Sequence, residues 1–172
     1  TRGAADVDTD PLIEAAEKIA QAENEAVLKG LDEANINGIL EASEHSSVTV
    51  EEDLVEPVVE ATKKLVAEGI KGPYNLLLGS ELYSLLYESK SNKGYPVKRR
   101  LTNLLEGNII YAPSLEDQGL LVPQDSEDFE FVSGQDISIG FSQQKGDELE
   151  FFLTESFTFR VTAPEAAVVL TK

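Results

Sequence analysis

The pattern of apolar residues changes near residue 108, and this change constrains the fold more than any other feature. Before it, apolar residues recur at helical spacing in the segments 12–27, 54–66 and 97–105. After it, short segments rich in β-branched and aromatic residues alternate with turn residues, which predicts strands at 109–111, 120–122, 129–132, 137–141, 149–161 and 166–170. Helices followed by a run of strands indicate an α+β fold.

The helix boundaries can be predicted from capping residues. Asp10-Pro11 suits a helix start, because Asp caps free N–H groups and proline at the first position loses no hydrogen bond. The apolar stripe that follows should end at Gly30. Asp53 suits the start of the second helix, which places Pro57 in its first turn and its end at Gly69.

The middle of the chain alternates between the two element types. The run Leu76–Leu78 predicts a short buried strand, and helices should follow from Ser80 and from Pro96. We expect Gly107 to close the second of these helices. The polar, serine-rich segment Glu41–Thr49 predicts a surface loop.

The charge of the chain limits its partners. The 172 residues contain 14 Lys and Arg against 32 Asp and Glu, a formal net charge of −18, which repels nucleic acid and anionic membranes. The apolar runs are too short to span a bilayer. The absence of cysteine excludes disulfides and Cys-based metal sites within these residues, and it is consistent with a reducing cytoplasm.

A search for catalytic groups finds no pattern that specifies a reaction. His45 is the only histidine and lies in the polar segment, so a zinc site lacks partners. The acidic clusters lack the spacing of a calcium-binding loop, and we interpret them as solvated loops and helix starts. No glycine-rich phosphate-binding loop is present. We therefore predict no catalytic residue, no metal site and no enzymatic activity.

One basic cluster interrupts the acidic sequence. Five of the 14 basic residues fall within eleven positions, namely Lys90, Lys93, Lys98, Arg99 and Arg100. The cluster could be an exposed loop and helix face that offsets local repulsion. It could equally form a positive surface that meets an anion or an acidic neighbouring subunit.

Several motifs resemble the encapsulin family. The stretches "GQDISIGF" (134–141), "TESFTFRV" (154–161) and "PEAAVVL" (164–170) are similar to its C-terminal signature in order and spacing. The segments 22–30, 69–79 and 94–100 are similar to the family as well, so the resemblance covers essentially the whole chain. The candidate motif residues are Gly134, Gln135, Asp136, Ser138, Ile139 and Gly140.

The resemblance implies the fold of the major capsid proteins of tailed phages. A discontinuous peripheral domain with a spine helix would comprise residues 1–30 and 146–172, and an axial domain residues 31–145. The chain would begin at the end of the extended loop, so that the N-terminal arm and that loop lie outside these 172 residues. Some members bind flavin near the extended loop, and we therefore expect no cofactor on this chain.

The resemblance also implies a function. Encapsulins are structural subunits that assemble with copies of themselves into icosahedral nanocompartments in the cytoplasm. These shells enclose cargo such as ferritin-like proteins or peroxidases, which act in iron storage or oxidative stress. The candidate loop at the five-fold pore is Lys90, Ser91, Asn92, Lys93, Gly94 and Tyr95. Two alternatives remain open: a tailed-virus capsid protein that encloses DNA, and a hydrolase or protease.

Overall fold

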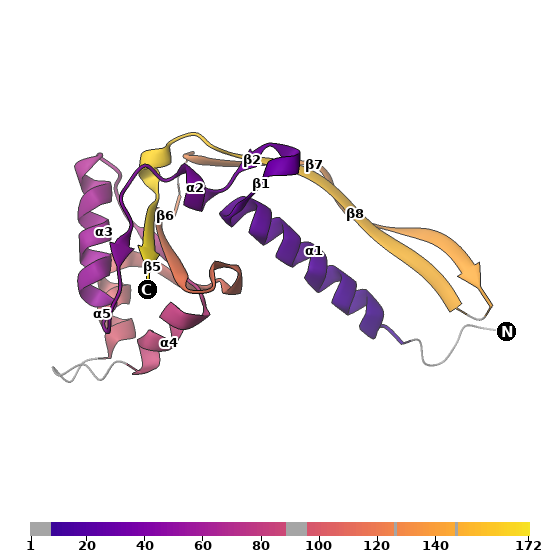
Figure 1. Ribbon diagram of the computed structural model, residues 1–172, viewed down its shortest axis with the longest axis horizontal. Helices are drawn as coiled ribbons and strands as arrows, with labels where there is room; N and C mark the ends of the chain where they lie inside the picture. The colour runs from indigo at the N-terminus through magenta and orange to yellow at the C-terminus, as the bar shows by residue number, and fades with distance from the viewer. Residues whose placement is uncertain (1–7, 89–95, 126, 147) are drawn as a thin grey trace.

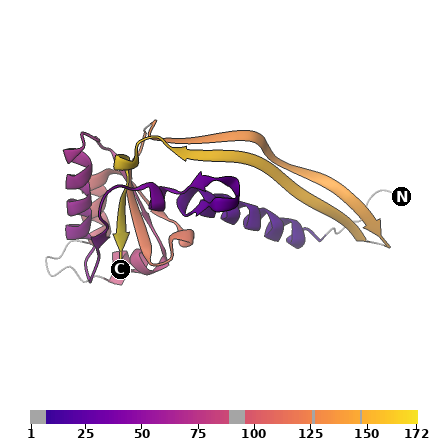
Figure 2. The same cartoon turned by 45° about the horizontal axis from the view of Figure 1, so that its top comes forward.

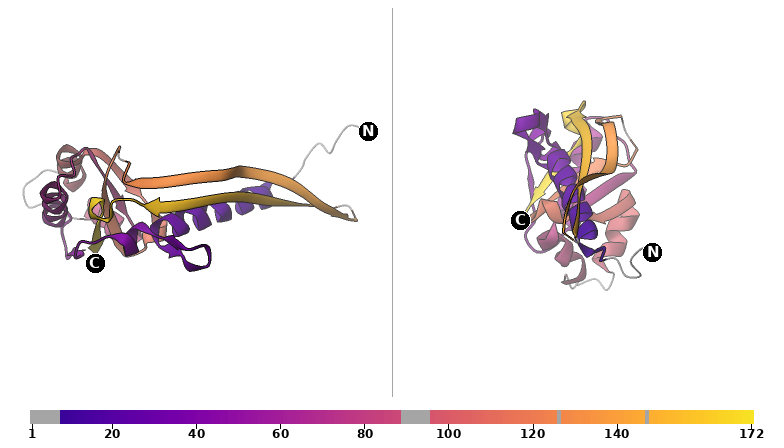
Figure 3. Two further views of the ribbon diagram at one scale, coloured as in Figure 1. Left: turned by 90° about the horizontal axis from the view of Figure 1, so that it is seen from above. Right: turned by 90° about the vertical axis from the view of Figure 1, so that its right-hand side faces the viewer.

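The computed structural model describes residues 8–88, 96–125, 127–146 and 148–172 and consists of a compact body and a long extension (Figure 1). The body contains a five-stranded sheet with helices packed on it. The extension contains the helix α1 and a two-stranded ribbon that run in the same general direction away from the body (Figures 2 and 3). This elongated outline leaves much of the extension without a partner among the residues that the structure describes.

The elements follow one another in the order of Figure 1. The helices are α1 (Asp10–Leu28), α2 (Ile39–Ala42), α3 (Val55–Ala67), α4 (Ser80–Glu88) and α5 (Val97–Leu105). Short 3-10 turns are η1 (Asp32–Ala34), η2 (Pro113–Leu115) and η3 (Pro164–Ala166). The strands are β1 (Gly30–Leu31), β2 (Ile36–Asn37), β3 (Val48–Thr49), β4 (Tyr74–Leu78), β5 (Glu106–Tyr111), β6 (Gln118–Pro123), β7 (Phe129–Lys145), β8 (Glu148–Val161) and β9 (Val168–Thr171).

The central sheet has the strand order β3-β9-β6-β4-β5 and mixes parallel with antiparallel pairs. Alternate residues of β6 and β9 point to opposite faces, as the period of a strand requires. Leu121 and Leu170 lie in the cluster formed with α3, α4 and α5, whereas Leu120 and Val169 lie in the cluster formed with the end of α1 and the root of the ribbon. The sheet is therefore buried on both faces.

The first two helices begin and end close to the predicted residues, but their N-caps are Thr9 and Leu54 rather than the predicted aspartates, and neither N-cap side chain makes a capping hydrogen bond. α1 begins at Asp10 and stops before Gly30, which has a φ of +96°. Asp53 Oδ1 accepts the N–H of Val55 at 3.1 Å, and Pro57 lies in the first turn of α3. Gly69, with a φ of +84°, follows the end of this helix. Local turn and proline chemistry therefore locates these boundaries to within about one or two residues.

The polar segment Glu41–Thr49 is not a simple surface loop. It includes the end of α2 and all of β3, which pairs in parallel with β9. The Ser43 hydroxyl donates to the Ala167 carbonyl at 2.8 Å, and His45 Nε2 lies 2.9 Å from the Glu165 carbonyl oxygen. Distant parts of the chain thus hold this segment, which local polarity could not indicate.

Gly107 does not close α5. Glu106 takes the left-handed conformation there, with a φ of +56°. Gly107 instead lies where β5 meets β4, and a Cβ at this position would be 2.3 Å from the Tyr74 carbonyl oxygen. The glycine is required by the close approach of two backbones rather than by the helix end.

The predicted strands 129–132 and 137–141 form the single strand β7, and residues 166–170 divide into η3 and β9. β7 is continuous, although its pairing with β8 is irregular at three places. The turn residues between 132 and 137 suggested a break between two strands. The strand pairing crosses the predicted domain boundary at 145/146. This boundary separates β7 from β8, although the two strands pair along nearly their whole length, and it places β9 in a different domain from the rest of the central sheet.

Candidate assembly surfaces

The outer part of the ribbon presents a surface of exposed apolar side chains. The extra residues of the irregular pairing all lie in β7, so the odd-numbered residues of β8 share one face, and Ile139 and Phe141 of β7 lie on it opposite Leu153 and Phe151. Phe141 and Phe151 form a direct cross-strand pair with ring centroids 5.9 Å apart, yet 58% and 52% of these side chains remain exposed. We call Ile139, Phe141, Leu149, Phe151 and Leu153 the distal ribbon face.

The inner part of the ribbon is anchored to the body. Phe159 is 6% exposed and belongs to the core cluster that includes Leu120. Phe131 and Phe157 stack with centroids 5.1 Å apart. On the opposite face, Arg160 and Glu130 form an ion pair across the strands. The ribbon is therefore fixed at its root, while its outer half projects from the body.

The family-motif residues lie in the middle of β7, where the pairing is irregular. Gln135 Nε2 donates to Ser138 Oγ at 2.7 Å, and Asp136 Oδ1 accepts the N–H of Ile137 at 2.8 Å. Gly140 pairs with Phe152, whose ring occupies the space that a side chain at 140 would need, because a Cβ there would lie 2.2 Å from the ring. These residues shape the ribbon backbone, and Ile139 adds to its apolar face.

Carboxylates meet where α1 lies beside the ribbon. Glu155 of β8 faces Glu23 of α1 and Asp136 of β7. Partial burial raises the pKa of Glu155 above its usual value, and the nearby Glu23 and Asp136 charges raise it further. The junction between α1 and the ribbon is therefore electrostatically unfavourable when all three groups are ionised.

A second exposed surface lies on the body, at the β5 edge of the central sheet. The Tyr83 ring lies 4.9 Å from the Tyr111 ring and 5.8 Å from the Tyr87 ring, measured between centroids. Lys98 Nζ lies 5.8 Å from the centroid of Tyr87. The hydrogen bond that Tyr83 and Tyr87 share, together with the Lys98 charge, lowers the pKa of Tyr87. We call these four residues the tyrosine–lysine patch.

Only part of this patch could be identified from the sequence. Lys98, Arg99 and Arg100 lie in the first turn of α5, as the basic cluster predicted, but the three tyrosines come from α4 and β5. The spacing of Tyr83 and Tyr87 indicates a shared helix face, whereas nothing local connects them to Tyr111. The candidate pore loop, Lys90 to Tyr95, lies outside the described residues.

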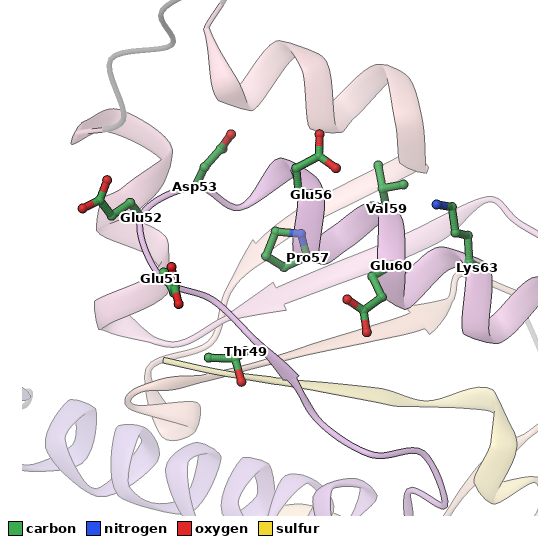
Figure 4. Close-up of a pocket in the computed structure, with 9 residues that line it drawn as sticks. All are labelled: Thr49, Glu51, Glu52, Asp53, Glu56, Pro57, Val59, Glu60 and Lys63. Carbon is green, nitrogen blue, oxygen red and sulfur yellow. The ribbon is translucent and has the colours of Figure 1, made fainter.

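An acidic hollow of about 570 Å³ lies beside β3 and the start of α3 (Figure 4). Its polar lining comprises Thr49, Glu51, Glu52, Asp53, Glu56, Glu60 and Lys63. In the part of the chain that the structure describes, no group of three or more His, Asp or Glu side chains could hold a metal ion. No described helix is long and apolar enough to cross a membrane. The distal ribbon face and the tyrosine–lysine patch are exposed surfaces that other protein chains could cover.

Comparison with known proteins decides the family. Residues 1–158 match the family described as an encapsulating protein for peroxidase. The chain belongs to the encapsulin family. It is 42% identical over 172 residues to a type 1 encapsulin shell protein of Rhodospirillum rubrum and 40% identical over 173 residues to one of Brevibacterium linens. Each match covers 98% of this chain but only 61% and 64% of the relative, so the chain spans less than two thirds of these encapsulins.

Solved structures confirm the capsid fold. A virus-like particle from Pyrococcus furiosus aligns with 95% of this chain and 68% of its own, with a TM-score of 0.75 and 21% identity. The capsid protein of the Myoviridae phage XM1 aligns with 94% of this chain and 64% of its own, with a TM-score of 0.64 and 12% identity. A ferritin-like–encapsulin shell fusion protein of Pyrococcus furiosus is 25% identical over 58% of this chain and 29% of its own length.

Proposed function

We propose that this encapsulin is a structural shell subunit, which assembles with copies of itself into an icosahedral nanocompartment. The shell would enclose cargo enzymes such as a peroxidase or a ferritin-like protein, in the cytoplasm. In this proposal the subunit has no catalytic role, because its function depends on the surfaces that neighbouring copies bury. The similarity to encapsulin shell proteins along nearly the whole chain supports this role.

The exposed distal ribbon face is the observation that carries the proposal. A two-stranded ribbon is marginally stable in water unless other elements cover it. Here Phe141 and Phe151 remain more than half exposed although they are paired with one another. Contiguous exposed apolar surface of this kind marks a site of protein contact. A ribbon that is fixed at its root and apolar at its end is suited to reach a neighbouring subunit.

The cargo enzymes are supported by the relatives rather than by a site on this chain. The family description names a peroxidase, and one relative is fused to a ferritin-like protein. The viral alternative has weaker support, because the phage capsid proteins share only the fold at 12% identity. The net charge of −18 also disfavours the packing of DNA.

The test is electron microscopy of particles purified from the native source, combined with mass spectrometry of their contents. We expect closed protein shells that contain a peroxidase or a ferritin-like protein. Particles filled with DNA would support the viral alternative instead. Full-length protein that remains monomeric at high concentration and moderate salt would contradict self-assembly itself.

We further propose that Lys90, Lys93 and Tyr95 line a pore at the five-fold axis, as the resemblance to encapsulins implies. One lysine per subunit around an axis forms a ring of positive charge, which selects ions by sign. Substitution of Lys90 and Lys93 by Gln should slow the entry of small anions into assembled shells, measured by stopped-flow quenching of an encapsulated dye. Unchanged entry in shells of normal size would contradict the pore assignment.

A further inference from the structure

We propose that the tyrosine–lysine patch is an oxidative cross-linking site, at which one-electron oxidation of two phenols joins the rings of Tyr83 and Tyr111 within one chain. The oxidant is hydrogen peroxide acting through a peroxidase that oxidises phenols. The inference rests on the proposed function in this one respect, because a peroxidase is among the proposed cargo enzymes. The cross-linking site itself needs no second subunit.

The composition of the chain makes tyrosine the main target of an oxidant. The 172 residues contain no cysteine, methionine or tryptophan. Sulfur side chains are the usual targets of oxidants in proteins. In the absence of sulfur and of indole rings, the phenol of tyrosine is the side chain that gives up an electron most readily. An oxidising equivalent that reaches these residues should therefore settle on a tyrosine.

Three of the five tyrosines lie together in the patch. Tyr87 and Tyr111 are 65% and 50% exposed, so an oxidant in solution can reach them. Tyr74 is buried, and its hydroxyl donates to the Ile70 carbonyl at 2.8 Å. Among the described residues, the phenols that an oxidant can reach are therefore those of the patch.

Tyr87 is the residue that loses an electron first. Its hydrogen bond with Tyr83 and the charge of Lys98 lower the pKa of Tyr87. A phenol that loses its proton more readily is also easier to oxidise, because the phenolate holds its electrons less tightly. The hydroxyl oxygens of Tyr83 and Tyr87 lie 3.5 Å apart, so Tyr83 can return a hydrogen atom to Tyr87 and become the radical itself.

Tyr83 and Tyr111 are the two residues that couple. Their ring centroids lie 4.9 Å apart, whereas those of Tyr83 and Tyr87 lie 5.8 Å apart. Tyr83 packs against the core of the body, and the N–H of Ala112, next to Tyr111, donates to the Leu78 carbonyl at 2.9 Å. The two rings are thus held in contact before oxidation. This proximity favours coupling within one chain over coupling between chains.

Two phenols and one molecule of hydrogen peroxide give one dityrosine and two molecules of water. Each phenol loses one electron and one proton, and the peroxide accepts both electrons and both protons as its O–O bond breaks. The two phenoxyl radicals then form a bond between carbon atoms that lie ortho to their hydroxyl groups. Each of these carbons releases its proton, which returns to the phenolic oxygen of the same ring, so that both rings become aromatic again.

The test is oxidation of the purified full-length protein by a phenol-oxidising peroxidase and hydrogen peroxide, followed by trypsin digestion and mass spectrometry. Trypsin cleaves after lysine and arginine, so Tyr83 falls in the peptide 72–90 and Tyr111 in the peptide 101–145. We expect a branched peptide that joins these two and lacks two hydrogen atoms, together with the fluorescence of dityrosine. The protein should remain a monomer on a denaturing gel, because the bond forms within one chain.

Single substitutions identify the coupled rings. Tyr83→Phe and Tyr111→Phe should each abolish the branched peptide, because phenylalanine lacks the phenol that is oxidised. Tyr87→Phe should slow the cross-linking several-fold without changing its position. Tyr74→Phe is the matched control, since Tyr74 lies in the same tryptic peptide as Tyr83 but is only 5% exposed, and it should leave the branched peptide unchanged. Circular dichroism of each variant confirms that the fold is retained.

Three results would overturn the inference. The first is wild-type protein that gives no branched peptide under these conditions. The second is a branched peptide that persists in Tyr83→Phe. The third is dityrosine that forms only between chains, which would appear as covalent dimers on the denaturing gel.

The outcomes also separate this inference from the proposed function, because the experiment supplies its own peroxidase and requires no assembly. If the purified protein forms the link but native particles contain no peroxidase, the proposed peroxidase cargo fails and the cross-linking site stands. If native particles contain a peroxidase but the purified protein forms no link, the cross-linking site fails and the shell function stands.

Discussion

The two phenylalanines Phe151 and Phe159 lie eight residues apart on the same face of β8, and their substitution should separate assembly from stability. Phe159 is buried at the root of the ribbon, with 6% of the residue exposed. Phe151 lies on the distal ribbon face and is 52% exposed. The same change to alanine therefore removes core packing in one case and an unused apolar surface in the other.

The magnitudes follow from these exposures. Loss of a fully buried phenylalanine costs about 3–5 kcal/mol, which we expect for the free energy of unfolding of Phe159→Ala. Phe151→Ala should cost about 1 kcal/mol, chiefly the contact with Phe141. A phenylalanine ring buries about 200 Å², so Phe151 still offers about 100 Å², worth about 2.5 kcal/mol per subunit to assembly. That free energy corresponds to about a 60-fold higher concentration for assembly.

Two assays distinguish the effects. Urea unfolding of unassembled protein, followed by circular dichroism, gives the free energy of unfolding, and light scattering gives the concentration of half-maximal assembly. We expect Phe151→Ala to change mainly the second quantity. The reasoning would be refuted if Phe151→Ala assembled like the wild type, or if it lowered the stability of the monomer as much as Phe159→Ala.

Three further predictions concern charge and backbone packing. Because the pKa of Glu155 is raised in the folded protein, its contribution to stability is present below the unfolded pKa of 4.5 and is lost as the pH rises through the folded pKa. Urea unfolding should therefore show that Glu155→Gln is more stable than the wild type at pH 7 but not at pH 4. Its neighbours Glu23 and Asp136 add to this repulsion, and Glu23→Gln should therefore shift stability in the same direction. The charge of −18 on these 172 residues makes neighbouring copies repel one another, so assembly followed by light scattering should strengthen between about 0.05 and 0.3 M salt. Equal assembly at low salt would mean that the interfaces neutralise this charge. Gly107→Ala should lower the thermal midpoint by several degrees, because its Cβ would lie 2.3 Å from the Tyr74 carbonyl oxygen; an unchanged midpoint would contradict the close approach.

The assembly surfaces could be predicted from the sequence only where their residues are neighbours. Lys98, Arg99 and Arg100 are consecutive, and the sequence analysis assigned them as one basic surface. Helix α5 separates Tyr83 of α4 from Tyr111 of β5 in the chain, and only the parallel pairing of β4 with β5 brings the two tyrosines together. The hollow was not predicted, because its acidic residues 51–53 form one of the runs that we interpreted as solvated loops and helix starts, and its shape depends on how α3 packs beside β3.

The sequence by itself determined the helices, the α+β class and the family. Helix boundaries depend on capping and apolar periodicity within a few residues, as Asp53 and Gly69 demonstrate. Strand partners are not encoded locally, because pairing joins segments far apart in the chain. Only the tertiary structure decided that 48–49 pairs with 170–171 and that two predicted strands are one long strand. It also decided which apolar residues enter the core and which, such as Phe151, remain exposed for another subunit.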